Sequence, residues 1–162
     1  MKIRRYLWIL NFIGAIIIII SIFTPTSYND TTSTFYYVWM NQIRVDIDPL
    51  HIYLLREDLQ LVTISTILAL IIFSSALMSL TLTSIYIRNS IPFKKLQWKM
   101  IVLVLFVLIS TLYWIIMMES FYNYFGANHW IFTGGGYSPY FGVIGPFIGA
   151  ALLVVGSFAR RA

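Results

Sequence analysis

The chain has 162 residues, of which 59% are hydrophobic and only 10% are charged, and it contains no cysteine. Soluble domains carry roughly 25% charged residues, so this composition excludes an ordinary soluble surface and predicts an integral membrane protein. The missing cysteines exclude disulfides, thiolate metal sites and cysteine nucleophiles. The net charge of +5 does not indicate a nucleic-acid partner, because the basic residues cluster beside apolar runs, where anionic lipid headgroups would lie.

Four apolar segments are long enough, or nearly so, to cross the hydrocarbon core as helices, which takes about 20 residues. They predict one integral membrane domain over residues 1–162, of mainly α class, with spans at residues 6–23, 59–87, 100–118 and 140–158. The first segment shares its basic start and apolar stretch with a secretory signal. It lacks a clear small-x-small cleavage site, which favours the membrane span.

The charged residues divide unevenly between the two sides of these spans. Nine cations and no acid lie on one side: Lys2, Arg4, Arg5, Arg88, Lys94, Lys95, Lys99, Arg160 and Arg161. The positive-inside rule then predicts a multi-pass protein of the cell membrane with both termini and the connection 88–99 in the cytoplasm. Four spans also require both termini on one side, so span count and charge agree. Residues 24–58 and 119–139 are then external.

The first external connection contains the stretch QIRVDID (residues 42–48), in which polar and apolar residues alternate as they do in a half-buried strand. It predicts a hairpin with TFYYVWM (34–40), joined by a third strand, HWIFT (129–133), from the second connection. The fold class is therefore a four-transmembrane-helix bundle with a small extracellular antiparallel β-sheet formed from both external loops. Its predicted residues are Trp39, Ile43, Val45, Ile47 and Trp130, with the isoleucines and Val45 facing the helix ends.

Two shorter motifs occur beside these strands. Asp48-Pro49 is typical of a helix N-cap followed by proline at the first helical position, and predicts an external helical turn or two before the second span. Asn29-Asp30-Thr31 is an N-x-T sequon on the external side, so Asn29 is a possible glycosylation site. The run Gly134–Gly136 predicts a flexible turn rather than a phosphate loop, because no lysine or helix start follows it.

Small residues mark the helix surfaces expected to pack in lipid, where close approach and polar contacts drive association. Gly145 and Gly149 form a GxxxG motif that Gly156 continues in the fourth span, and Ser75, Ser79 and Thr83 recur at spacing four in the second. These two faces are expected either to pack against each other within one bundle or to meet a second copy or another subunit. Asn11 is expected to find a hydrogen-bond partner such as a serine of the second span.

No motif supports a catalytic, metal or cofactor site, so no enzymatic activity and no cofactor are expected. His51 and His129 fall in different external connections, and two unrelated surface histidines are a simpler interpretation than a zinc site with Glu119 or Asp46, because no ligand spacing supports one. Glu119 is expected to pair with Arg44 or Arg56 at the outer boundary. No ionisable residue lies deep in any span, which disfavours a pump or coupled transporter.

This layout resembles the claudin and peripheral-myelin-protein superfamily. The segment GYSPYFGVIGPFIGAALLVVGS (136–157) is similar to the end of the claudin second loop and its small-residue fourth helix. Trp39 matches a tryptophan of the family's first-loop signature, whereas the paired cysteines of that signature are missing. The resemblance implies a scaffold, adhesion or barrier protein that acts through its extracellular sheet and lateral helix packing.

Two other functions remain open at this point. The chain is alternatively a small accessory or assembly subunit of a larger membrane complex, or the protomer of an oligomeric channel or transporter. The expected partners are membrane lipid and either further copies of this chain or other membrane subunits, with no nucleic acid.

Overall fold

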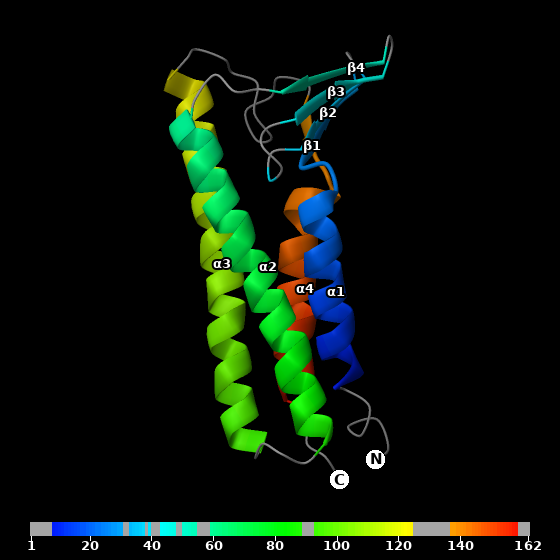
Figure 1. Cartoon of the computed structure of the whole chain (residues 1–162), viewed down its shortest axis with the longest axis vertical. Coiled ribbons are helices and arrows are strands. Elements are labelled where there is room, and N and C mark those ends of the chain that lie inside the picture. The colour runs from blue at the N-terminus through cyan, green and yellow to red at the C-terminus, as the bar shows by residue number, and fades with distance from the viewer. Residues whose placement is uncertain are drawn as a thin grey trace.

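The computed structural model describes residues 8–30, 33–37, 39, 43–47, 50–54, 59–88, 93–124 and 137–158. Four helices form an elongated bundle: α1 (Ile9–Phe23), α2 (Leu59–Ile87), α3 (Phe93–Tyr124) and α4 (Phe141–Ser157). A small sheet lies at one end of this bundle, and α2 ends and α3 begins at the other (Figure 1). The prediction of four helices with a small antiparallel sheet is confirmed. Two of the helices, α2 and α3, are long and apolar enough to cross a membrane.

The third helix is longer than the predicted span of residues 100–118. It begins at Phe93, directly after Pro92, and continues to Tyr124, so it takes up parts of both predicted connections, 88–99 and 119–139. Hydropathy detects only the apolar part of a helix. The helix itself can continue beyond that part wherever one of its faces still packs against its neighbours. Leu96 and Met100, four residues apart, are both buried at this end, which explains why the lysines around them did not end the helix.

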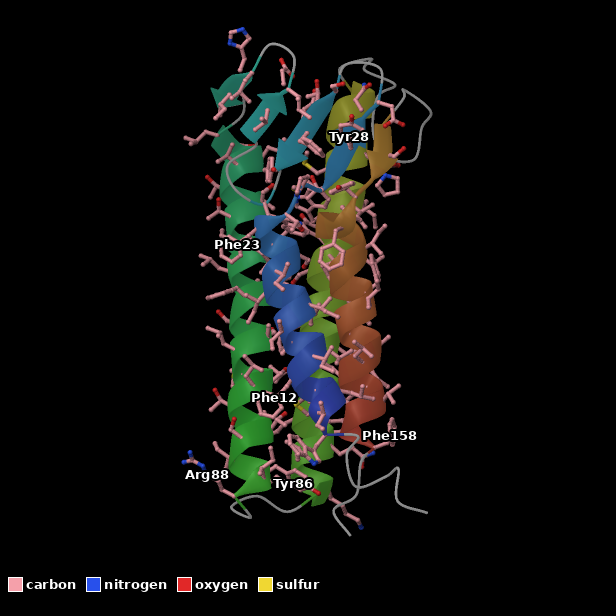
Figure 2. The ribbon with its side chains drawn as sticks, turned by 90° about the vertical axis from the view of Figure 1, so that its right-hand side faces the viewer. Phe12, Phe23, Tyr28, Tyr86, Arg88 and Phe158 are labelled. Atoms are coloured by element: carbon pink, nitrogen blue, oxygen red, sulfur yellow. The ribbon has the colours of Figure 1, made fainter. Side chains whose placement is uncertain are left out.

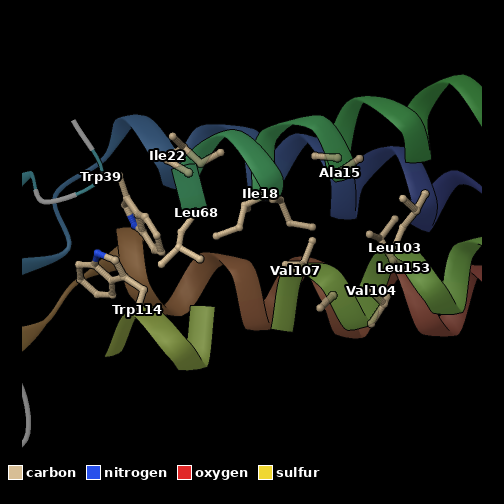
Figure 3. Packing of buried hydrophobic residues seen from close by; sticks show 14 of the residues in the cluster. Ala15, Ile18, Ile22, Trp39, Leu68, Leu103, Val104, Val107, Trp114 and Leu153 are labelled. Atoms are coloured by element: carbon tan, nitrogen blue, oxygen red, sulfur yellow. The ribbon is translucent and has the colours of Figure 1, made fainter. Parts of the chain in front are cut away.

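Each helix packs against two neighbours, so that α1, α2, α3 and α4 form a closed ring in chain order. Large apolar side chains from all four fill the centre, among them Ile18, Leu68, Val107 and Leu153 (Figure 3). The predicted packing of α4 against α2 is wrong, because these two helices lie diagonally opposite in the ring. The glycines of α4 face α1 instead.

Glycines hold α1 and α4 at very short range. A Cβ atom added to Gly149 would overlap Ile18 Cγ1 and would lie 2.6 Å from the carbonyl oxygen of Gly14. A Cβ at Gly145 would lie 2.5 Å from Ser21 Cβ, and one at Gly156 would overlap the side chain of Asn11. The stripe Gly145, Gly149 and Gly156 is therefore occupied by α1 of the same chain. The alternative in which this stripe meets a second copy or another subunit has no free surface there.

The small residues of α2 are buried, but they do not form the expected polar contacts between helices. The Ser75, Ser79 and Thr83 hydroxyls each donate to the backbone carbonyl four residues earlier, at 2.8, 2.9 and 2.8 Å. A hydroxyl has one hydrogen to donate, so each donor is used within its own helix. These residues therefore matter for their small size, and their hydroxyls do not donate hydrogen bonds to a neighbouring helix. The expected hydrogen bond of Asn11 is also missing among the described residues: its side chain is buried beside Gly156, and neither its amide oxygen nor its amide nitrogen has a partner there.

The sheet has five antiparallel strands in the order β4-β3-β2-β1-β5. They are β1 (Ser27–Asn29), β2 (Thr34–Tyr37), β3 (Ile43–Asp46), β4 (His51–Leu54) and β5 (Tyr137–Pro139). Four strands come from the connection between α1 and α2 and the fifth from the connection between α3 and α4, so a sheet built from both connections is confirmed. The predicted hairpin is also confirmed, with Phe35 paired to Val45 and Tyr36 to Arg44.

One local prediction about this sheet needs correction. Residues 51–54 form β4, paired in register with β3 through Val45 and Ile52, and not the predicted helical turns. The β-branched and aromatic residues Ile52 and Tyr53 favour a strand once β3 offers a free edge. The predicted third strand at residues 129–133 lies outside the described residues and stays a prediction, and the described strand of that connection is β5, at residues 137–139.

The glycine contacts predict the effect of a larger side chain. We expect Gly149→Leu to destabilise the bundle by about 1–3 kcal/mol, because overpacking of a close helix contact costs this much. Ala151→Leu places the same side chain two residues further along α4 at an exposed position and is expected to leave stability unchanged. Thermal unfolding in detergent, followed by circular dichroism, measures both. Equal melting temperatures of the two variants would contradict the close α1–α4 contact.

Candidate functional site at the sheet end of the bundle

The sheet is anchored to the bundle by Trp39, which follows β2 and is only 3% exposed. Its indole N–H donates a hydrogen bond of 3.1 Å to the backbone carbonyl of Gly142, in the first turn of α4. Its ring stacks on Trp114 of α3, with the ring centroids 4.4 Å apart and an angle of 26° between the planes. Figure 3 shows the two indoles facing each other at one end of the core. One side chain therefore joins the first connection to two helices.

The Gly142 carbonyl is available to Trp39 because of Pro146. In an α-helix this carbonyl would accept from the N–H of residue 146, but proline has none. A buried carbonyl without a partner is costly, and the indole N–H of Trp39 supplies the missing donor. The proline in α4 thus creates an acceptor for a residue more than a hundred positions earlier in the chain.

Backbone hydrogen bonds join the end of α1 to the start of α4. The Pro25 carbonyl accepts from the Gly142 N–H at 2.8 Å, and the Thr26 carbonyl accepts from the Tyr140 N–H at 2.9 Å. Thr26 is fully buried, and both its N–H and its hydroxyl donate to the Tyr36 carbonyl of β2. Since β1 follows α1 and β5 precedes α4, these bonds place β1 and β5 side by side, and the two strands pair.

The two faces of the sheet differ in burial. One face, the inner face, carries Ser27, Asn29, Thr34 and Tyr36; the first three are almost completely buried, and Tyr36 packs against the hydrophobic core. The Thr34 hydroxyl donates to Asp46 Oδ1 at 2.8 Å, which satisfies polar groups on this face. The inner face is therefore polar in composition, buried and hydrogen-bonded.

The opposite face, the outer face, carries an apolar row across four strands. Tyr28 pairs with Phe35, Phe35 with Val45, and Val45 with Ile52, and directly paired residues project on the same side of a sheet. Tyr140, at the start of α4, adds a third ring, 5.6 Å from Phe35 and 6.4 Å from Tyr28. Ile52 is 68% exposed. Tyr28, Phe35 and Val45 are half-buried among the described residues, so the row is aromatic and aliphatic and is most exposed at Ile52.

The prediction that the helix ends cover the apolar residues of β3 is wrong, because these residues lie on the face of the sheet opposite the buried one. Val45 is half-buried on the outer face, and Ile47, two residues further and on the same side, is 47% exposed. The alternation of QIRVDID is real, but the packed side is the polar one. The reason is that buried serine, threonine and asparagine residues of β1 and β2 find hydrogen bonds there, a condition that alternation alone does not reveal.

The other predicted residues have mixed outcomes. Trp39 is a central contact of this site, whereas the side chain of Ile43 and all of Trp130 lie outside the described part of the chain. Asn29 lies in β1 with 6% of its surface exposed, so an attached glycan would have to displace its buried side chain. Glycosylation there stays a prediction.

The described ionisable groups at this end of the bundle do not come together as a metal site. Within the described residues, no group of three or more His, Cys, Asp and Glu side chains lies close enough to hold a metal ion. One carboxylate oxygen of Glu119 is buried without a hydrogen-bond partner. The side chains of its predicted partners, Arg44 and Arg56, lie outside the description, so that pairing also stays a prediction.

Some residues of this site were not singled out from the sequence. Trp114, Tyr140 and Thr26 belong to no motif that marks them in the sequence. Pro146 did carry a signal, because a proline inside a helix frees the carbonyl four residues earlier and so requires a donor for Gly142. The chain matches no known protein-family model, no curated protein and no solved structure.

The hydrogen bond to Gly142 makes the role of Trp39 testable. Trp39→Phe keeps an aromatic ring for stacking on Trp114 but removes the donor, so the buried carbonyl loses its partner at a cost of about 1–3 kcal/mol. We expect a lower melting temperature and faster proteolysis within residues 24–58. Trp98→Phe, at a residue that is 69% exposed, is the matched control. If both variants are digested at the same rate, Trp39 does not anchor the sheet.

Proposed function

We propose that this chain is a claudin-like, four-pass protein of the cell membrane that mediates adhesion, barrier formation or lateral scaffolding through the outer face of its sheet. The observation that carries the proposal is the apolar row of Tyr28, Phe35, Val45 and Ile52 at the end of the bundle opposite the exposed cations. Exposed apolar surfaces bordered by polar residues are typical of interaction sites.

Membrane insertion is supported by the outside of the bundle. Large apolar side chains are exposed along all four helices, including Ile16, Leu70, Ile109 and Ile148. A helix that is apolar on every side is suited to a protein core or to lipid. At 15 and 17 residues, α1 and α4 are shorter than the usual span, but the strands and the Tyr140 ring begin directly where these two helices end. That position suits a membrane interface.

Orientation is supported by the positions of the charges. Arg88, Lys94, Lys95 and Lys99 are all exposed where α2 ends and α3 begins, at the end away from the sheet (Figure 1). The positive-inside rule places this end in the cytoplasm. The sheet then lies outside the cell, and both termini lie inside.

The claudin resemblance is supported by the architecture in three respects. Both connections at one end contribute strands to a single sheet, and α4 packs through glycines. Trp39, which the resemblance matches to a tryptophan of the family's first-loop signature, ties that sheet to the helices. The missing cysteine pair separates this chain from the family's usual pattern. The Trp39 bond to Gly142 and the bonds of Thr26 to Tyr36 hold the first connection in place here.

Adhesion through the outer face predicts that a charge on it abolishes contact between membranes. Two vesicle populations carrying the full chain and different fluorophores are mixed, and clustering is followed by dual-colour light microscopy. We expect Ile52→Lys to reduce clustering several-fold, because a buried lysine without a partner opposes association. Leu59→Lys, at an exposed apolar residue outside the sheet, is expected to cluster normally.

The alternative functions give different results. Vesicles that never cluster, together with purification of the chain as one subunit of a larger complex at fixed stoichiometry, would favour an accessory subunit. Ion or solute flux through vesicles that contain only this chain would favour a channel or transporter protomer. Either outcome would replace the adhesion proposal.

A further inference from the structure

A second feature of the bundle lies on its side, between α2 and α3, away from the sheet. An open groove of about 380 Å³ is lined by Ile67, Leu70, Ile71, Ser74, Ser75, Met78, Leu103 and Phe106. Ser75 and Leu103 are buried and form its inner side, while Leu70, Met78 and Phe106 are more than half exposed. The only polar groups in the lining are the two serine hydroxyls, and that of Ser75 is bonded to the Ile71 carbonyl. The groove is suited to an apolar chain.

The length of the groove is set by its α2 residues. Ile67 and Met78 are eleven residues apart, which corresponds to about 16 Å along a helix at 1.5 Å per residue. On α3 it is lined by Leu103 and Phe106, which lie toward the α2–α3 connection. The groove therefore lies around the middle of α2, and Met78 and Leu103 form its end nearest the exposed lysines.

Two lysines continue the groove at its basic end. Lys99 precedes Leu103 by four residues, and Lys95 precedes Lys99 by four, so all three lie on one face of α3. At about 100° per residue, Lys95 and Lys99 are both within roughly 20° of Phe106 around the helix, whereas Lys94 is roughly 120° away. Lys95 and Lys99 are exposed. On α3, Lys99 thus lies about one helical turn beyond the apolar groove, and Lys95 lies about two turns beyond it.

The surroundings reinforce the positive charge. Residues 59–118, which include all of α2 and α3 as far as Met118, contain no Asp or Glu. Arg88, at the end of α2, points away from the bundle near the same end (Figure 2), and Trp98 beside Lys99 is 69% exposed. Exposed tryptophans and lysines are typical of the level at which lipid headgroups lie.

We propose that this groove is a binding site for one anionic phospholipid of the cytoplasmic leaflet. One acyl chain lies in the groove between α2 and α3, and the headgroup phosphate contacts Lys95 and Lys99. The inference rests on the membrane insertion and orientation proposed above, but not on the role of the sheet. A helix from a second copy fits less well, because a two-fold contact across this face would bring both lysine pairs to the same level opposite each other.

The site is tested on the full chain in dodecyl maltoside by native mass spectrometry, with dioleoyl phosphatidylglycerol and dioleoyl phosphatidylcholine as probes. The acyl chains are the same, so the comparison isolates the headgroup charge. We expect one phosphatidylglycerol per chain, bound about 10-fold more tightly than phosphatidylcholine, since each nearby lysine contributes to attraction of an anionic lipid. Glycerol phosphate, which has the charge without the chains, is expected not to bind detectably.

Two pairs of variants separate the parts of the site. Lys95→Gln/Lys99→Gln is expected to weaken phosphatidylglycerol binding on the order of 10-fold, whereas Lys94→Gln, off the groove face, has a much smaller effect. Ser74→Leu fills the groove and is expected to weaken both lipids, whereas Ser74→Ala leaves the groove open and binding intact. Melting temperatures measured without lipid check that each variant is folded.

Several results would overturn the proposal. Equal binding of the two lipids would show that the site does not recognise a charged headgroup. If Lys94→Gln weakened binding as much as Lys95→Gln/Lys99→Gln, the lysines would attract the lipid only through diffuse positive charge. Normal binding by a folded Ser74→Leu variant would remove the acyl chain from the groove. A dimer that Ser74→Leu dissociates would assign the groove to a second copy. None of these outcomes depends on vesicle clustering, so failure here is distinct from failure of the adhesion proposal.

Discussion

The close approach of α1 and α4 is the constraint on which the rest of the structure depends. It is possible because Gly14, Gly145, Gly149 and Gly156 carry no side chain of their own, so that atoms of the facing helix occupy the space that a Cβ would fill. Once these helices touch, the chain leaving α1 and the chain entering α4 emerge together, and the carbonyls of Pro25 and Thr26 accept hydrogen bonds from α4 and the residue before it. Strands β1 and β5 then pair, and β2, β3 and β4 add in order. Helix packing in the bundle thus determines how the sheet begins.

Helix α4 also holds the connection between α1 and α2, because one of its own backbone hydrogen bonds is missing. Pro146 leaves the Gly142 carbonyl without a helical donor, and Trp39 supplies one while it stacks on Trp114. The sheet is therefore held at the start of α4 by two kinds of contact, the backbone hydrogen bonds next to β1 and β5 and the buried indole that follows β2. This arrangement holds a small sheet in place without disulfides.

Much of this architecture was predictable from the sequence, and the errors have physical causes. Apolar length identified the helices, and alternation identified the hairpin of β2 and β3, because both signals are local. The partner of the glycine stripe was not predictable, since GxxxG marks a close contact without saying which helix fills it. The buried face of β3 was assigned to the wrong side, because the hydrogen bonds that satisfy Thr34 and its neighbours come from other strands. Asp48-Pro49 indicated the start of a helix, and it did not reveal that His51–Leu54 would pair with the edge of the sheet. Pro146 was the overlooked signal, because it implied a donor for Gly142.

The proposed roles place two kinds of contact at opposite ends of one molecule, an apolar sheet face outside the membrane and a lipid groove with two lysines near the cytoplasm. The sheet face requires that the α1–α4 contact bring β1 and β5 together. Because the chain has no native cysteine, this is measured most directly by disulfide formation between Tyr28→Cys and Ser138→Cys, at positions paired directly across β1 and β5. A membrane-impermeant oxidant is applied to intact cells, and the remaining thiols are counted by a maleimide mass tag after denaturation. We predict that both thiols are lost, and that adding Gly145→Leu restores them. Thiols that stay free in the double-cysteine protein, or a disulfide that Gly145→Leu leaves unchanged, would contradict the account.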